Sequence, residues 1–233
     1  AGIADEGGWW PLFDSNEEAL ATLVAAIERA GEKPGERVTI SLDIAASEFW
    51  KNGKYRLALE DRDMDTEALI DMLAGWLDAY PIVSIEDPVA EDDQEGMKEF
   101  TRRLGDEVQI KGDDYQVTKT ELVREAIESG ACNSVLVKVN QVGTVTEAVN
   151  ALLAAEEAGW QGVVSARSGE TEDVTISHLA TGLGSGQLKV GSFNRTERMV
   201  KWNECLRIQD VLGADKFVGG TPLSNTWWGR KYL

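Results

Sequence analysis

The chain has 233 residues, of which 42% are hydrophobic, and this is enough for one large α/β domain or two small ones with a buried core. Its formal net charge of −18 excludes a basic stripe of the kind that neutralises nucleic-acid phosphates. No apolar run approaches the length of a membrane span. We therefore expect neither a nucleic-acid nor a membrane partner, and an anionic substrate would need local positive charge from a metal and a few Lys or Arg side chains.

The two cysteines, Cys132 and Cys205, are far apart and show no metal-ligand spacing, which predicts reduced thiols in a cytoplasmic protein. No secretory signal pattern opens the chain. The chain also lacks an initiating Met, so an upstream segment remains an open alternative.

In chain order, the first residues (1–11) are rich in glycine, acid and tryptophan and predict a loop. Ser15 precedes a helix-period stretch that closes at Gly31. A strand over 38–43 follows, and the Asn52-Gly53 pair predicts a hairpin excursion after it. Helices are then predicted at 65–79, 94–104, 119–129, 144–158, 171–182 and 195–212, alternating with strands at 82–86, 108–112, 134–138, 162–165 and 187–190. The last residues, 217–233, have no clear period and are expected to wrap the outside.

Six of the predicted strands end in an ionisable or hydroxyl-bearing side chain, and after a longer first gap these ends recur about every 25 residues. Helix-period stretches fill the gaps, which is typical of βα units that feed a parallel sheet. In a parallel (β/α) barrel all strand C-termini open on one face, so these side chains would converge there. The six ends are Asp43, Glu86, Asp113, Lys138, Ser165 and Lys189.

A complete eight-stranded barrel needs two further βα units that the sequence does not show. Six parallel strands in an open sheet would leave unpaired edges, which proteins usually cover. We therefore expect a fragment, a missing upstream portion, or a partner chain that closes the barrel.

The three acids at successive strand ends, Asp43, Glu86 and Asp113, predict a divalent cation site. Carboxylates that converge repel one another unless a cation lies between them, and an all-oxygen ligand set suits Mg²⁺. The alternative for any one of them is a helix N-cap at the end of a βα loop.

Lys138 and Lys189 are predicted to be buried at the ends of interior strands. Burial beside a second lysine and a metal disfavours the charged form, and this makes a lysine a usable base near neutral pH. The alternative is a lysine that extends to the rim or pairs with Asp114.

Several long sequence blocks resemble the enolase family (phosphopyruvate hydratase), over a stretch from Asp5 to about Leu212. The resemblance implies an α/β fold of the enolase C-terminal, TIM-like barrel type. Residues 1–233 would form one partial barrel domain with six βα units in 38–212, and the family's N-terminal domain and first barrel strands would be absent. The blocks are DEGG at 5–8, SLDIAASEF at 41–49, SIEDPVAEDD at 84–93, GDD at 112–114, VKVNQVGT at 137–144, SARSGETED at 165–173 and QLKVGS at 187–192.

The resemblance also implies a role for eight residues and Mg²⁺ as the cofactor. The base would remove the proton next to the substrate carboxylate, and the acid would help the hydroxyl group to leave. The implied metal ligands are Asp43, Glu86 and Asp113, the catalytic base is Lys138, the acid is Glu6, the contact to the substrate carboxylate is Lys189, and the phosphate contacts are Arg167 and Ser168.

The chain departs from the family at Ala166, where enolases carry a histidine. The only histidine, His178, lies in a helical stretch and is interpreted as a solvated residue. Trp9 and Trp10 follow the DEGG block and would either form a remodelled pocket lid or pack the loop onto the barrel rim.

Three functions follow as hypotheses. The first is Mg²⁺-dependent dehydration of 2-phosphoglycerate to phosphoenolpyruvate through an ene-diolate, a step of glycolysis, by a cytoplasmic homodimer. The second is an enolase-like enzyme of phosphonate biosynthesis that acts on a different phospho- or phosphono-carboxylate. The third is a truncated, non-catalytic protein that works by association.

Overall fold

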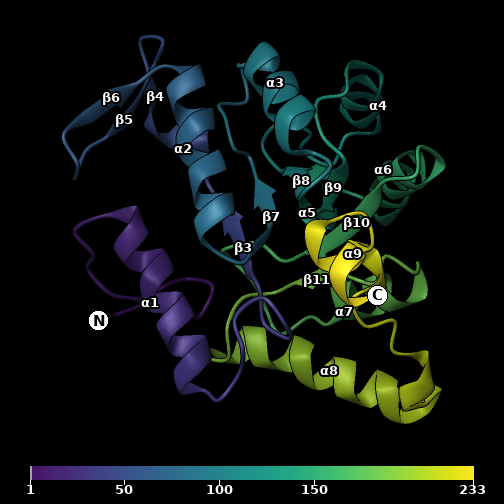
Figure 1. Cartoon of the computed structure of the whole chain (residues 1–233). Helices are drawn as coiled ribbons and strands as arrows, with labels where there is room; N and C mark the ends of the chain where they lie inside the picture. The colour runs from purple at the N-terminus through teal and green to yellow at the C-terminus, as the bar shows by residue number, and fades with distance from the viewer. Residues whose placement is uncertain (1) are drawn as a thin grey trace. The chain divides into compact units, whose positions relative to one another are not determined.

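The computed structural model describes residues 2–233, which form two compact units, each built from several stretches of the chain (Figure 1). The carboxylate unit contains Phe13–Tyr115, Glu125–Asn133 and Leu223–Leu233. The lysine unit contains the chain up to Leu12, Gln116–Arg124 and Ser134–Pro222. Helix α4 (Thr120–Ser129) runs from the lysine unit into the carboxylate unit.

In the carboxylate unit, strands β3 (Ile40–Asp43), β7 (Ile82–Glu86) and β8 (Gln109–Gly112) pair in parallel. All residues of β7 and β8 are buried, as expected for strands of a parallel sheet that is covered on both faces. The remaining elements of this unit are α1 (Asn16–Arg29), η1 (Ala46–Phe49), α2 (Thr66–Ala79), α3 (Gln94–Leu104) and α9 (Trp227–Tyr232), with the antiparallel strands β4 (Trp50–Lys51), β5 (Lys54–Leu57) and β6 (Arg62–Met64).

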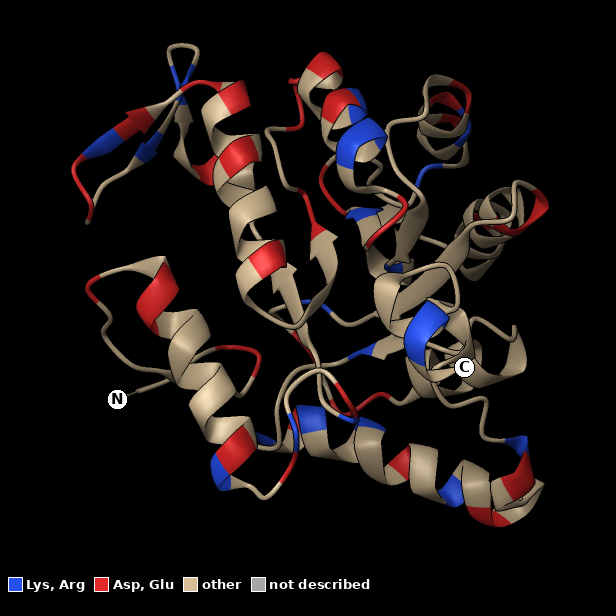
Figure 2. Ribbon diagram, viewed as in Figure 1, with Lys and Arg blue, Asp and Glu red and all other residues tan. Residues whose placement is uncertain are grey.

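The helices of this unit begin where the sequence supplies a side-chain cap. The side chains of Ser15, Asp65 and Asp93 accept hydrogen bonds from backbone N–H groups in the first turns of α1, α2 and α3. Helices α2 and α3 lie side by side, and α3 carries charged residues of both signs (Figures 1 and 2). Arg103 of α3 pairs with Asp71 of α2 at 2.7 Å.

The C-terminal segment is attached to the carboxylate unit through tryptophan. Trp227 donates its indole N–H to the backbone oxygen of Ile82 at 2.6 Å, and its backbone N–H bonds to the oxygen of Glu107. Arg230 pairs with the Glu107 carboxylate at 2.7 Å. A residue on α9 thus satisfies a backbone group of β7, and this helix lies in a segment for which the sequence analysis expected no regular element.

In the lysine unit, strands β9 (Ser134–Val137), β10 (Gln161–Ser165) and β11 (Leu188–Lys189) also pair in parallel. Gly162 allows α6 to approach the sheet, because a Cβ at this position would lie 2.1 Å from a methyl carbon of Leu152. The other elements are β1 (Gly2–Ile3), β2 (Trp9–Trp10), α5 (Val139–Val142), α6 (Val145–Glu157), α7 (Thr175–Gly182), α8 (Thr196–Leu212), η2 (Ala214–Lys216) and η3 (Thr221–Leu223).

The predicted alternation of strands and helices is confirmed, with boundaries that differ mostly by one or two residues. Several short elements were missed: the β1–β2 pair, the β6 strand, the α5 and α9 helices and the short 3-10 helices η1, η2 and η3. The prediction of a plain loop at the N-terminus is wrong, because Gly2 and Ile3 pair antiparallel with the two tryptophans. Trp9 and Trp10 are 70% and 68% exposed, so they do not pack the loop down as one of the two interpretations required.

Across residues 2–233, none of the helices is both long enough and apolar enough to span a bilayer.

Candidate active site

Strands β3 and β7 place two of the predicted metal ligands next to each other. Asp43 and Glu86 are direct partners in the parallel pairing, and the backbones of paired strands lie about 5 Å apart. Partners in a parallel pair project from the same face of the sheet, so both carboxylates lie on one side of the carboxylate unit's sheet. Glu86 is fully buried, whereas Asp43 is exposed.

The third predicted ligand, Asp113, lies in a turn that Asp87 holds in place. One carboxylate oxygen of Asp87 accepts the backbone N–H of Asp113 at 2.9 Å, and the other accepts that of Asp114 at 2.8 Å. Asp87 has a φ of +43°, a strained value for a residue other than glycine, which indicates that its surroundings fix it there. Burial, followed by the neighbouring acids, raises the pKa of Asp87 to about 7, although both backbone hydrogen bonds act to lower it.

Carboxylate oxygens of Asp87, Asp113 and Asp114 lie within 4.8 Å of one another. Oxygen-only clusters of this size fit Mg²⁺ or another hard divalent cation. The cluster shares Asp113 with the predicted ligand set, while Asp87 and Asp114 were not predicted as ligands. A signal was present in the sequence, because each of these residues is the second acid of an adjacent pair, Glu86-Asp87 or Asp113-Asp114.

Lys111 of β8 was also missed, and it brings a positive charge to this group of acids. Its ammonium group lies 3.4 Å from a carboxylate oxygen of Glu86 and 3.4 Å from the hydroxyl oxygen of Ser41. Both charged side chains are buried, with 5% and 0% of their side-chain surface exposed. The buried Glu86 carboxylate therefore has a cation from the chain itself at ion-pair distance.

In the lysine unit, the strand register aligns Lys138, Ser165 and Lys189 on three neighbouring strands. Ser165 pairs with Lys189, and Val164 pairs with Val137, which directly precedes Lys138. The two lysines are half-buried, so the expectation that they are buried is wrong. The cause is the position of each at the end of its strand, where the chain leaves the sheet.

Glu6 and Ser168 lie together in the same unit although 162 positions separate them in the sequence. The Ser168 hydroxyl donates a hydrogen bond to the Glu6 carboxylate at 2.5 Å. The backbone oxygen of Glu6 accepts the N–H of Ser192 at 2.8 Å, so the segment after β11 also contacts this loop. A Cβ on Gly191 would lie 2.2 Å from the same oxygen, and only glycine permits this approach.

Arg198 on α8 joins the loops that carry these residues. Its guanidinium group donates hydrogen bonds to four backbone oxygens from three separate parts of the chain, and Arg198 is 0% exposed. The acceptors and distances are Asp5 at 3.1 Å, Arg167 at 2.8 Å, Ser168 at 2.7 Å and Val190 at 2.9 Å.

One turn further along α8, Lys201 contacts the same loop. Its ammonium group pairs with Glu170 at 3.0 Å and donates to the backbone oxygen of Thr171 at 2.8 Å. The second carboxylate oxygen of Glu170 accepts the backbone N–H of Arg167 at 2.8 Å. Two buried cations on one helix thus fix the backbone on which Arg167 and Ser168 lie.

The chain was also compared with known protein families. Residues 1–225 match the family described as "Enolase, C-terminal TIM barrel domain". The match covers far more than half of the 233 residues. The chain belongs to this enolase family.

Family membership assigns the fold as an α/β TIM-like barrel domain of the enolase type, and the two sets of three parallel strands are consistent with it. It also indicates lyase-type chemistry of the enolase superfamily. The cluster of Asp87, Asp113 and Asp114 is suited to a divalent metal in such a domain.

The structure also places two further residues that the sequence analysis singled out, Ala166 and His178. Ala166, at the end of β10, is buried, and its backbone N–H bonds to the oxygen of Lys189. His178 is exposed on α7 and pairs with Glu204 at 3.0 Å, as expected for a solvated helix residue.

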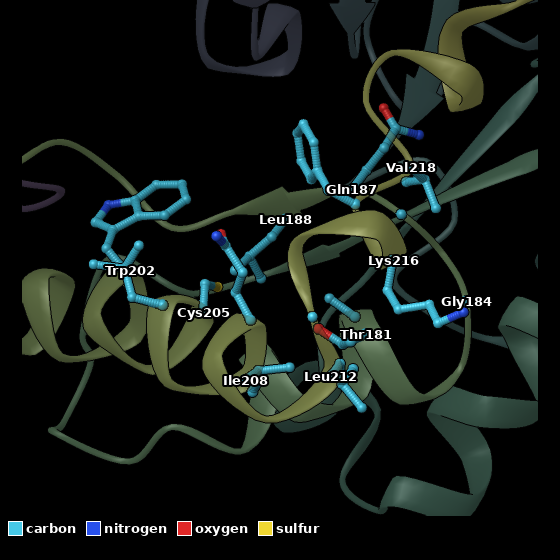
Figure 3. A pocket seen from close by; sticks show the side chains of 16 residues that line it. Thr181, Gly184, Gln187, Leu188, Trp202, Cys205, Ile208, Leu212, Lys216 and Val218 are labelled. Carbon is cyan, nitrogen blue, oxygen red and sulfur yellow. The ribbon is translucent and has the colours of Figure 1, made fainter.

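A pocket of about 380 Å³ lies within the lysine unit, among α7, the start of β11, α8 and η2 (Figure 3). Trp202, Cys205 and Ile208 of α8 and Leu188 are among the residues that line it. Among the described residues, none of the predicted catalytic, metal-binding or substrate-binding side chains lines this pocket. It is therefore separate from the groups described above.

Proposed function

We propose that this chain is the catalytic barrel of a Mg²⁺-dependent enolase that dehydrates 2-phosphoglycerate to phosphoenolpyruvate. The observation that carries the proposal is the alignment of Asp43 with Glu86 beside the acidic cluster at Asp113, in a chain of the enolase family. A glycolytic role, a cytoplasmic location and a homodimer follow from the same proposal.

The residues proposed to hold Mg²⁺ are Asp43, Glu86 and Asp113, with Asp87 fixing the turn that presents Asp113. When bound, the ion would neutralise the negative charge that develops on the substrate carboxylate as the neighbouring proton is removed. Without such neutralisation that proton is too weakly acidic for a lysine to abstract.

Lys138 is the proposed base, and Lys189 is proposed to contact the substrate carboxylate. The register of β9, β10 and β11 supports this assignment, because it aligns the two lysines around Ser165. A base needs to reach one substrate carbon while a second cation holds the carboxylate next to it.

Glu6 is the proposed acid for the departing hydroxyl group, and Arg167 and Ser168 are proposed to bind the phosphate. In 2-phosphoglycerate the phosphate and the departing hydroxyl are on adjacent carbons, so these groups have to act close together. The hydrogen bond between Glu6 and Ser168 supports this, and a bound substrate would replace it.

The test is dehydration of 2-phosphoglycerate by the full chain with Mg²⁺, followed by the ultraviolet absorbance of the enol product. Replacing Lys138 by Met is expected to lower kcat by about 10²- to 10⁴-fold. Lys216→Met is the matched control, because the Lys216 side chain is 67% exposed. Binding of Mg²⁺ without any turnover by the unmodified chain would refute the dehydratase and favour the non-catalytic hypothesis.

A second candidate substrate, a different phospho- or phosphono-carboxylate, is favoured by Ala166. This small buried residue replaces the histidine expected from the enolase sequence pattern, directly before Arg167. Ala166→His tests the choice: if the substitution produced ordinary 2-phosphoglycerate turnover in an inactive chain, the divergent-substrate candidate would lose its main support.

A further inference from the structure

Lys111 has no role in the proposed reaction, yet its charged side chain is buried, and burying a charge costs free energy. The parallel pairing makes it the direct partner of Glu86, so both side chains project from the same face of the sheet. An ammonium group that is 5% exposed needs compensation for its lost hydration, and the Glu86 oxygen at 3.4 Å supplies it.

Several acids lie around Glu86 at the strand ends of the carboxylate unit. Glu86 has Asp43 beside it in the register and Asp87 after it in the chain, and Asp113 and Asp114 cluster with Asp87. Two residues earlier along both strands, on the same face, the paired side chains are neutral: the Ser84 hydroxyl bonds to the Gln109 side chain at 3.1 Å. Lys111 is therefore a cation that this chain itself places against the buried Glu86 carboxylate.

We propose that Lys111 is a resident counter-ion that sets the divalent-metal affinity of this chain. In the metal-free protein it neutralises Glu86 and so stabilises the buried carboxylate. When a divalent cation binds, Lys111 competes with it for Glu86 and repels it, which weakens binding. This inference rests on the proposed function only in taking Glu86 as a metal ligand.

The test measures the dissociation constant of Mg²⁺ alone for the full chain by isothermal titration calorimetry. Lys111→Met removes the charge and keeps an unbranched side chain, and because the repulsion of the metal is lost it is expected to bind Mg²⁺ about tenfold more tightly. Lys111→Arg keeps the charge and is expected to stay near the unmodified affinity. Lys54→Met, at an exposed position at the start of β5, removes a charge elsewhere and is expected to change the affinity by less than about twofold.

A second measurement separates a loss of folding from a change in binding. Lys111→Met is expected to unfold at a lower temperature than the unmodified chain without metal, and the difference is expected to shrink or reverse in saturating Mg²⁺. If Lys111→Met does not fold, Lys111→Gln, which is neutral and able to hydrogen-bond, makes the same comparison.

The outcomes are distinct. If all variants bound Mg²⁺ with equal affinity, the counter-ion role of Lys111 would be refuted, while the proposed metal site would still be supported. Lack of Mg²⁺ binding by every variant would reject both this inference and the proposed function. Binding by Lys111→Met but not by the unmodified chain would support the inference in its strongest form.

Discussion

Replacing Arg198 with methionine should release the loops that carry Glu6, Arg167 and Ser168. The guanidinium group of Arg198 makes four hydrogen bonds to backbone oxygens and is fully buried. Methionine fills much of the same volume but donates none of these bonds. The substitution therefore tests whether one side chain holds the loops in place.

The expected loss in the free energy of unfolding of Arg198→Met is the difference between two large contributions. A hydrogen bond from a charged group contributes roughly 1.5–3 kcal/mol, so the loss of four would be severe. Removing a buried charge recovers several kcal/mol of desolvation cost, and a net loss of about 3–5 kcal/mol in the free energy of unfolding remains. Arg198→Lys keeps the charge with fewer aligned donors, so we expect a smaller loss of roughly 1.5–3 kcal/mol.

The assay is urea denaturation combined with amide hydrogen exchange in the native protein. Exchange should accelerate at Gly7 and Ser192, whose N–H groups bond within the loops that Arg198 joins. Arg207→Met on the same helix is the control, because that side chain is 65% exposed, and it should change stability by less than about 0.5 kcal/mol. A loss below about 1 kcal/mol for Arg198→Met, with unchanged exchange at these amides, would refute the reasoning.

Three other substitutions or titrations test the packing. Gly162→Ala should lower the free energy of unfolding by about 1–3 kcal/mol in denaturant titrations, because the new methyl group would clash with Leu152 of α6. Gly182→Ala is the control: this helix position has open space around it, so the substitution should be neutral or stabilising. Burial raises the pKa of the Cys132 thiol, so in the native protein an alkylating reagent should modify Cys205 quickly and Cys132 only after denaturation. Burial raises the pKa of Tyr55 to about 12. The free energy of unfolding should then not depend on this group below about pH 10. It should fall above that pH, because the tyrosine loses its proton at a lower pH in the unfolded chain than in the native one. In a titration followed by phenolate absorbance, Tyr55→Phe should lack one of the groups that titrate at high pH.

The sequence predicted the order of strands and helices because that order depends on local patterns. The side chains of Ser15, Asp65 and Asp93 cap helices as expected for these residue types at helix N-termini. The strand ends at Asp43 and Glu86 follow from short β-branched runs, and these residues are partners in the observed sheet. The resemblance to enolases likewise rested on continuous blocks of sequence, and the family match agrees with it.

Other features depend on register and on contacts between distant segments. Nothing in the local pattern around Lys111 shows that it faces Glu86, because the register of β7 against β8 decides the pairing. The Asp87 side chain was missed because its role follows from a turn with φ of +43° that directs both its oxygens at another loop.

The sequence by itself therefore determined the elements, their alternation and the residue types at the strand ends, since hydrophobic period and capping act over a few residues. Only the tertiary structure decided which charges meet. Arg198 contacts Asp5 across 193 positions, and its bonds to that loop and to Ser168 form only when distant segments of the lysine unit pack together. Such contacts are fixed by packing and register, and the local period of a sequence carries no information about them.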